Sequence, residues 1–240
     1  MERETCQFHR SLEWPEIPLM TTINELNLIQ RLANIPYTGA LSDILDERGF
    51  HNQVLPPEIQ SLEPGTTVAG RALTILGEPT TRTDSETIFL PFLRMLGDVR
   101  PGDVLVSQPQ DNVAAHLGEL SSETAKTRGA RGAVIDGGAR DTDYIRRLGF
   151  PVFARYKTPR DIVGRWRLVD YNVPITIGAV KVHPGDFVAG DQDGVVVIPY
   201  AAAEEVITQA EQVVVTENQV RKAILDGVHP VDAFTKFGRF

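Results

Sequence analysis

The chain has 240 residues, of which 42% are hydrophobic, enough to bury the core of one large domain. Its 24 Lys and Arg are scattered among 32 Asp and Glu, and the net charge of −8 argues against a nucleic-acid partner held through its phosphates. No stretch approaches the roughly 20 apolar residues of a membrane helix, and the polar N-terminus lacks the apolar core of a secretory signal. We therefore expect a cytoplasmic protein that acts on a small molecule or a protein.

The first part of the chain, residues 1–21, differs in character from the rest. It contains Pro15 and Pro18 and shows neither helical nor strand periodicity. We interpret it as an N-terminal arm. The remainder, residues 22–240, is expected to form a single domain.

Two helices are expected directly after the arm. Thr22 and Glu25 have the spacing of a capping box, so the first helix is expected to begin near Thr22. A second, shorter helix is expected over 41–47, where apolar residues fall on one face. Ser42 and Asp43 would lie at its start and are interpreted as capping rather than catalytic residues.

Strands and helices alternate irregularly in the rest of the chain. Three Pro-Gly pairs, which favour type II turns, each precede a run with strand character. Strands are expected within 66–75, 103–108, 132–136, 151–156, 174–182, 186–191 and 194–199, and helices within 85–96, 113–129 and 200–227. This order indicates an α/β fold with mixed sheets, and the absence of G-x-G-x-x-G and Walker sequences argues against a nucleotide site.

The stretch "IDGGARDTD" at 135–143 joins an expected strand to an expected helix, a place where α/β proteins put their chemistry. Gly137 and Gly138 would allow a backbone path closed to residues with side chains. Arg140 and helix N-terminal amides are suited to bind the carboxylate of a ligand. An acid such as Asp141 beside that carboxylate is explained if a divalent cation, Mg²⁺ or Mn²⁺, lies between the two negative groups. The alternative is a plain helix cap at Asp141 with a surface ion pair at Arg140.

A second segment, "HLGELSS" at 116–122, places Gly118 and Glu119 within an otherwise helical run. Glu119 precedes Arg140 by 21 positions, about one crossover helix and one strand. Neighbouring parallel strands would then bring both loops to one edge of the sheet. His116 could touch a substrate, but a single histidine at such a place is more often a packed or surface residue, and the histidines of the chain have no ligand-like spacing.

Other polar clusters have simpler interpretations. Asp191 and Asp193 precede an apolar run and are interpreted as a hairpin turn, with a subunit interface as the alternative. Glu204 and Glu205 complement the dipole of the last helix. The basic cluster over 155–167 is interpreted as a solvated loop, with capture of a second substrate carboxylate as the alternative.

The segments "RGARGAVIDGGARD", "PGDFVAGDQDGVVVIP" and "FTKFGRF" resemble the family of the regulator of ribonuclease activity A and the 4-hydroxy-4-methyl-2-oxoglutarate aldolases. The aldolase branch carries an acid, twenty intervening residues, then Arg-Asp. Glu119, Arg140 and Asp141 match that pattern, and the likeness covers 22–240. Glu119 stands where Asp is usual, which keeps the carboxylate but lengthens its reach.

The resemblance implies an RraA-like swivelling β/β/α domain with mixed sheets, peripheral helices and a C-terminal helix. It implies a homotrimer or homohexamer with the active site between subunits. The implied activity is that of a divalent-metal-dependent lyase, a class II pyruvate aldolase. Such an enzyme splits a 4-hydroxy-2-oxo acid to pyruvate and a second oxo acid, and also decarboxylates oxaloacetate.

The resemblance also assigns residues. Asp141 would bind Mg²⁺ or Mn²⁺, Arg140 would hold the substrate, and the amides of Gly118, Glu119 and Leu120 would receive the pyruvyl carboxylate. Glu119 would act on a metal-linked water or on the substrate hydroxyl, and a neighbouring subunit would add another acid. The alternatives are a regulator that binds a ribonuclease without catalysis, against which Asp141 weighs, and a metal-dependent hydrolase or isomerase of a related oxo acid.

Overall fold

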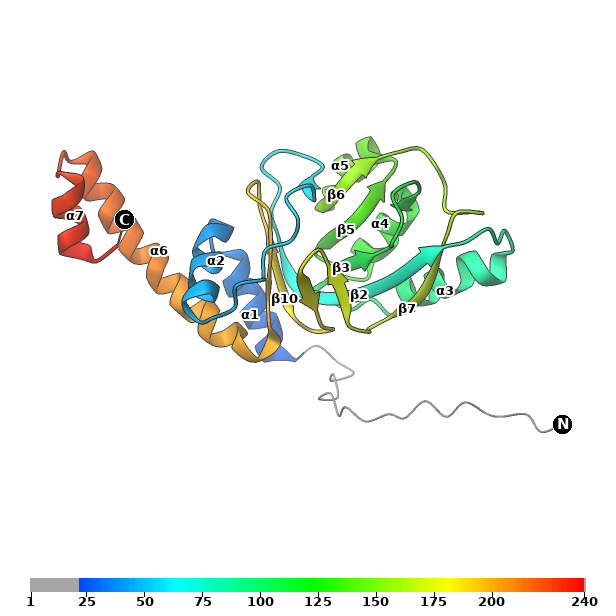
Figure 1. Cartoon of the computed structure of the whole chain (residues 1–240), viewed down its shortest axis with the longest axis horizontal. Coiled ribbons are helices and arrows are strands. Elements are labelled where there is room, and N and C mark those ends of the chain that lie inside the picture. The colour runs from blue at the N-terminus through cyan, green and yellow to red at the C-terminus, as the bar shows by residue number, and fades with distance from the viewer. Residues whose placement is uncertain (1–21, 240) are drawn as a thin grey trace.

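The computed structural model describes residues 22–239, and the expected N-terminal arm lies outside them. The fold is mixed α/β, as the sequence predicted (Figure 1). The helices are α1 (Ile23–Ala33), α2 (Thr38–Glu47), α3 (Ser85–Gly97), α4 (Glu119–Thr127), α5 (Thr142–Leu148), α6 (Ala203–Leu225) and α7 (Pro230–Phe237), with a 3₁₀ turn at Tyr200–Ala202. The strands are β1 (Gln60–Ser61), β2 (Val68–Pro79), β3 (Asp103–Gln108), β4 (Ala115–Leu117), β5 (Gly132–Ala139), β6 (Val152–Lys157), β7 (Trp166–Tyr171), β8 (Ile175–Ile177), β9 (Val180–Val182), β10 (Phe187–Gly190) and β11 (Val195–Ile198).

Nine strands form one mixed sheet with the order β1-β6-β5-β3-β2-β10-β11, in which β4 pairs with β5 and β7 with β2. The central strands β2, β3, β5 and β6 are parallel, whereas β1, β7, β10 and β11 run antiparallel to their neighbours. Because parallel strands end at the same edge, the segments after β3, β4 and β5 are brought together there.

Alternation along the strands divides the core between the two faces of the sheet. In β3, Leu105 packs in the cluster beneath α3, α4 and α5, while Val104 and Val106 face the β8–β9 hairpin on the other side. A third cluster joins α1, α2 and α6 to β10 and β11. Beyond it α6 extends away from the sheet and α7 packs on its far part (Figure 1). None of the described helices combines the length and the apolar character needed to cross a bilayer.

Most of the expected elements are confirmed. The capping box at Thr22 and Glu25 is present, with the Glu25 amide donating to Thr22 Oγ1 at 3.1 Å. All three glycines of the Pro-Gly pairs have positive φ, as type II turns require, at Gly65, Gly102 and Gly185.

Four expectations about local structure were wrong or incomplete. The second helix begins at Thr38, so Ser42 and Asp43 lie inside it and do not cap it. The expected helix over 113–129 is strand β4 followed by α4, and the expected strand over 174–182 is a hairpin that turns at Gly178. Strands β1 and β7 and helix α7 were not foreseen, because short or amphipathic segments acquire their structure from the surfaces they pack on.

A buried ion network fixes α1 to the sheet. Arg71 on β2 donates to Asp103 Oδ1 at 2.8 Å and to Glu25 Oε1 at 3.4 Å, and all three side chains are at most 4% exposed. Burial raises the pKa of Asp103, and the Arg71 guanidinium opposes that rise. One cation therefore stabilises two carboxylates that have lost their water.

Candidate active site

Strand β4 is the element that brings the two predicted segments together. Its residues pair in parallel with the end of β5, and the Arg140 amide donates to the Leu117 carbonyl at 2.9 Å. Gly118 and Glu119, which follow β4, therefore lie beside Arg140 and Asp141, which follow β5. The expected meeting of these loops at one sheet edge is confirmed, although it is made through a short strand that we expected to be helical.

These residues line a cleft of about 330 Å³ between α3, α4 and the ends of β4 and β5. All five residues singled out from the sequence line it: Gly118, Glu119, Leu120, Arg140 and Asp141. A further acidic residue, Asp161, lines it as well and was not singled out. The cleft is therefore polar at the ends of the strands.

Asp141 has a backbone conformation that is unusual for a residue with a side chain. Its φ of 54° and ψ of 33° are left-handed, and it stands at the N-cap position of α5 without a side-chain bond to the α5 amides. Instead, its Oδ2 accepts from the Glu119 amide at 3.1 Å and lies 3.5 Å from Arg140 Nε. The plain helix cap is thus not what this carboxylate forms. Left-handed residues of this kind cost free energy and gather at functional sites.

Among the residues that the structure describes, the ion contacts of the Arg140 guanidinium are all long. Its Nη1 lies 3.6 Å from Asp161 Oδ1, its Nε lies 3.5 Å from Asp141 Oδ2, and the side chain remains 36% exposed. Both separations exceed a good charge-assisted hydrogen bond, so a bound carboxylate can compete for this planar fork.

Asp161 comes from the basic cluster over 155–167, where no local pattern distinguishes it from other loop acids. The Ala115 amide donates to the Arg160 carbonyl at 2.9 Å, and this bond holds the loop against β4. Two arginines of that cluster are paired away from the cleft, Arg155 with Asp136 and Glu58, and Arg167 with Glu78. Asp161 therefore lines the cleft, whereas Arg155 and Arg167 do not.

Two of the three amides expected to receive a carboxylate already have acceptors within the chain. The Gly118 amide donates to Ser121 Oγ at 3.0 Å, and the Glu119 amide donates to Asp141. Leu120 follows in the first turn of α4, where amides have no intrahelical acceptor. A Cβ on Gly118 would lie 2.7 Å from Asp141 Oδ2, so a glycine is needed for this close approach.

The other members of "IDGGARDTD" have structural roles. Asp136 pairs with Arg155, and Asp143 lies 3.6 Å from Arg146 one turn along α5. Gly137 and Gly138 belong to strand β5 and neither has positive φ, so the expectation that this path is closed to residues with side chains is met without a special backbone conformation. Glycine is needed at both positions because there is no room for a side chain. A Cβ at Gly137 would lie 2.6 Å from the ring of His116, and a Cβ at Gly138 would clash with Tyr156.

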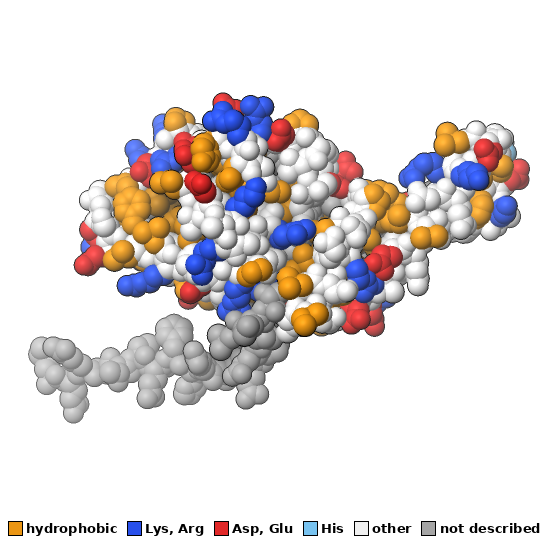
Figure 2. Space-filling model, turned by 180° about the vertical axis from the view of Figure 1, so that it is seen from behind, with side chains coloured by type: hydrophobic (Ala, Val, Ile, Leu, Met, Phe, Trp, Pro, Cys, Tyr) orange, Lys and Arg blue, Asp and Glu red, His pale blue; other side chains and the backbone are white. Residues whose placement is uncertain are grey.

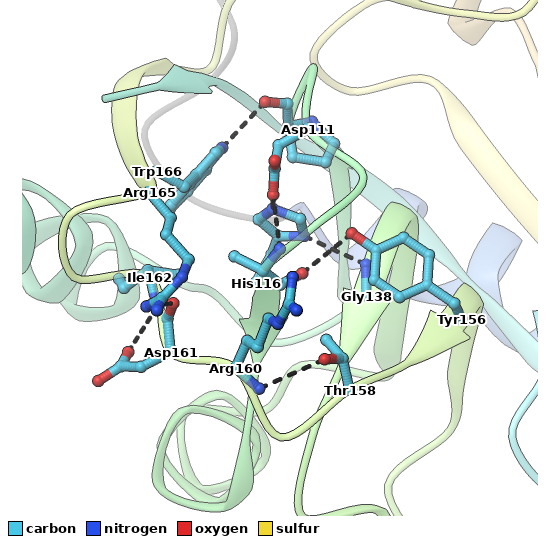
Figure 3. A network of polar contacts seen from close by, with 12 residues as sticks. Asp111, His116, Gly138, Tyr156, Thr158, Arg160, Asp161, Ile162, Arg165 and Trp166 are labelled. Atoms are coloured by element: carbon cyan, nitrogen blue, oxygen red, sulfur yellow. Dashed lines mark hydrogen bonds and ion pairs between the residues drawn. The ribbon is translucent and has the colours of Figure 1, made fainter. Parts of the chain in front are cut away.

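His116 is buried, lines the inner part of the cleft and holds β4 to β5 (Figure 3). Its Nδ1 accepts from the Gly138 amide at 3.2 Å, so its Nε2 carries the proton and donates to Asp111 Oδ2 at 3.0 Å. The ring packs edge-on against Trp166, with centroids 5.1 Å apart. The prediction of a packed histidine is confirmed.

The stability of the protein is expected to fall in mild acid because of His116. Burial lowers the pKa of His116 from its ordinary 6.5 to about 4. Below pH 6.5 the histidine is therefore protonated in the unfolded chain but stays neutral in the folded chain. The free energy of unfolding should consequently fall by roughly 2 kcal/mol between pH 8 and pH 5. Urea unfolding between pH 8 and 5 measures this loss. The His116→Gln variant has no titrating group at this position, so its free energy of unfolding should fall by roughly 2 kcal/mol less over the same range. If the free energies of unfolding of the two proteins changed with pH in parallel, His116 would not be the cause.

Among the described residues no three His, Cys, Asp or Glu side chains form a cluster that could hold a metal ion. Mg²⁺ does not require one, because it keeps several waters and binds through one or two carboxylates together with substrate oxygens. The exposed Asp141 carboxylate, near Glu119 and Asp161 in the same cleft, fits that donor chemistry.

Asp191 and Asp193 form the turn between β10 and β11, as predicted, with the Asp191 amide donating to the Gly194 carbonyl at 3.0 Å. Asp191 also accepts from the Thr38 amide at 2.6 Å and from Thr38 Oγ1 at 2.9 Å. It therefore supplies the cap that Ser42 and Asp43 do not give to α2. Both acids lie outside the cleft-lining residues.

Comparison with known proteins identifies the family of this chain. Residues 38–197 match the RraA-like family, described as Aldolase/RraA. A protein of Halalkalibacterium halodurans named "Putative 4-hydroxy-4-methyl-2-oxoglutarate aldolase" is 33% identical over 211 residues, 88% of this chain and 94% of that protein.

Two solved structures are similar over most of the chain. An uncharacterized protein from Pseudomonas syringae pv. tomato has a TM-score of 0.76 and 29% identity, covering 87% of this chain and 96% of its own. RraAS2 of Streptomyces coelicolor, described as an unusual member of the RNase ES inhibitor RraA protein family, has a TM-score of 0.73 and 30% identity, covering 81% and 96%. With two thirds of its length matched by the family and this fold shared, the chain belongs to the RraA-like family.

Proposed function

We propose that this protein is a divalent-metal-dependent lyase that cleaves a 4-hydroxy-2-oxo acid to pyruvate and a second carbonyl compound, and that it also decarboxylates oxaloacetate. The observation that carries the proposal is the left-handed Asp141, whose carboxylate lies beside the weakly paired Arg140 in an open cleft. The aldolase name of the Halalkalibacterium halodurans relative supports it.

Cleavage of the C3–C4 bond leaves the enolate of pyruvate, so the site must stabilise negative charge on the former ketone oxygen. Arg140 is suited to hold the C1 carboxylate and to add positive charge there. The C4 hydroxyl must lose its proton as C4 becomes a carbonyl, and Glu119 is the base we assign to this step. Glu119 can then give this proton to C3 of the enolate, which yields pyruvate. Decarboxylation of oxaloacetate gives the same enolate without that base.

Asp141 would hold Mg²⁺ or Mn²⁺ together with oxygens of the substrate. The ion, when bound, supplies a positive charge that stabilises the enolate. We also infer a homotrimer or homohexamer in which a neighbouring subunit adds an acid to the site. Within residues 22–239 no three His, Cys, Asp or Glu side chains form a cluster, and an acid from a neighbouring subunit would add a further protein ligand to the ion.

The test is pyruvate release by the purified protein with MgCl₂ or MnCl₂, using oxaloacetate and 4-hydroxy-4-methyl-2-oxoglutarate, with the metal-only rate subtracted. We expect activity with both substrates and its loss in EDTA. Solvent deuterium exchange at the pyruvate methyl group, followed by NMR, tests enolate formation alone. A protein that neither releases pyruvate nor catalyses this exchange would refute the proposal, and binding to a ribonuclease would then favour the regulator.

A further inference from the structure

Two carboxylates from different loops flank the guanidinium of Arg140. Asp141 Oδ2 lies 3.5 Å from its Nε, and Asp161 Oδ1 lies 3.6 Å from its Nη1. A guanidinium can bind a carboxylate through two parallel hydrogen bonds along the Nε–Nη2 edge or along the Nη1–Nη2 edge. One acid therefore stands at each edge. Figure 2 shows acidic and basic side chains next to the hydrophobic ones that gather over α3, which forms one side of this cleft.

The two edges of the guanidinium are not equivalent for the proposed reaction. The Nε–Nη2 edge faces Asp141, the carboxylate that we assign to the metal, and the Nη1–Nη2 edge faces Asp161. A substrate carboxylate on the first edge is placed beside Asp141, with the neighbouring ketone oxygen on the same side. A carboxylate on the second edge is directed toward another acid. The first edge is therefore the one that suits the reaction.

The loop that carries Asp161 is held in place at several points (Figure 3). The Ile162 amide donates to Asp161 Oδ1 at 2.6 Å, and the Trp166 amide donates to the Ile162 carbonyl at 2.9 Å. Ile162 is 8% exposed and Trp166 is fully buried. The bond from the Ala115 amide to the Arg160 carbonyl fixes the other side of the loop to β4. The Asp161 carboxylate is thus a positioned negative charge at the Nη1 end of Arg140.

We propose that Asp161 is a positioning residue, which holds the Nη1 end of Arg140 and so directs the C1 carboxylate of the substrate to the Nε–Nη2 edge. This inference rests on the proposed function and concerns how the same site orients its substrate. Ordering a free arginine side chain on binding costs conformational entropy, and an arginine that is ordered beforehand avoids part of that cost. The contacts lie within one chain, so they do not depend on what a neighbouring subunit adds to the cleft.

The Asp161→Asn variant tests this role. Asparagine keeps the shape of the side chain and an oxygen that can accept from the Ile162 amide, but it removes the charge that holds Arg140. We expect KM for oxaloacetate to rise about tenfold while kcat stays within about threefold, because an ordered guanidinium favours bound substrate and transition state alike. Removing a negative charge that merely repels the substrate would lower KM. The sign of the change therefore separates positioning from repulsion.

Oxalate, which resembles the enolate of pyruvate, gives a readout that does not require turnover. Isothermal titration of the protein with oxalate in MgCl₂ should show a Kd about tenfold higher in Asp161→Asn. Asp170→Asn is the matched control, because Asp170 Oδ1 also accepts from the amide of the next residue, at 2.8 Å, but Asp170 is exposed and does not line the cleft. The control should change Kd and KM by less than about twofold. An unchanged or lower Kd in Asp161→Asn, or a loss that appears in kcat, would overturn the proposal.

The two measurements separate this inference from the proposed function. If the unmodified protein neither releases pyruvate nor exchanges its methyl protons, the lyase proposal has failed. Weaker oxalate binding in Asp161→Asn would in that case still support the orientation of Arg140 by Asp161. Lyase activity together with unchanged oxalate affinity in the variant means that the lyase proposal stands and the role of Asp161 is wrong. An unmodified protein that does not bind oxalate would overturn the inference.

Discussion

Replacing Asp141 with Asn is expected to lower kcat/KM for pyruvate release by roughly 10³-fold while leaving the fold intact. Asparagine has the same shape, tolerates the left-handed backbone at this position, and can still accept from the Glu119 amide. What is lost is one negative charge at the oxygen that we assign to the metal. The loss of kcat/KM in Asp141→Asn therefore reports the contribution of the charge, because the shape of the side chain is unchanged.

A nearby acid provides the control. Asp143 lies two residues further along, in the first turn of α5, with its side chain 84% exposed. Asp143→Asn makes the same chemical change outside the cleft and should stay within twofold of the unmodified protein. Mn²⁺ binding, measured by EPR, should weaken in Asp141→Asn alone. An Asp141→Asn variant that kept more than a tenth of the activity would remove Asp141 from the mechanism.

The strands of this fold are largely readable from the sequence, because β-branched runs behind Pro-Gly turns specify both the extended backbone and its starting point. The end of β3 at Gln108 and the type II turns are examples. Strand β4 was missed because its three residues have no pattern of their own, and pairing with β5 makes them extended. The start of α2 was missed because its cap, Asp191, is distant in sequence.

The candidate site divides in the same way. Glu119, Arg140 and Asp141 could be predicted, since their spacing along the chain reflects how adjacent parallel strands end at one edge. Asp161 could not, because a backbone bond between the Ala115 amide and the Arg160 carbonyl brings its loop to the cleft. The apolar side chains of α3 that line the cleft were also not foreseen, since α3 has the amphipathic pattern of an ordinary core helix.

The largest stability effect is expected from Arg71→Met, which would leave Glu25 and Asp103 as buried carboxylates without their cation. Removing one partner from a buried ion network typically costs 3–5 kcal/mol, and we expect a loss of about that size in urea unfolding at pH 8. Arg48→Met is the control, because its ion pair with Glu205 lies at the surface and should contribute less than about 1 kcal/mol.

The pH dependence identifies the cause of that loss. Burial already raises the pKa of Asp103 against the opposing effect of Arg71, so removing the guanidinium should raise that pKa further. A carboxyl group with a raised folded pKa destabilises the fold above that pKa and ceases to do so once it is protonated. The stability gap between Arg71→Met and the unmodified protein should therefore narrow as the pH falls from 8 to 5. A gap that stayed constant over this range would instead assign the loss to packing of the arginine side chain between α1 and the sheet.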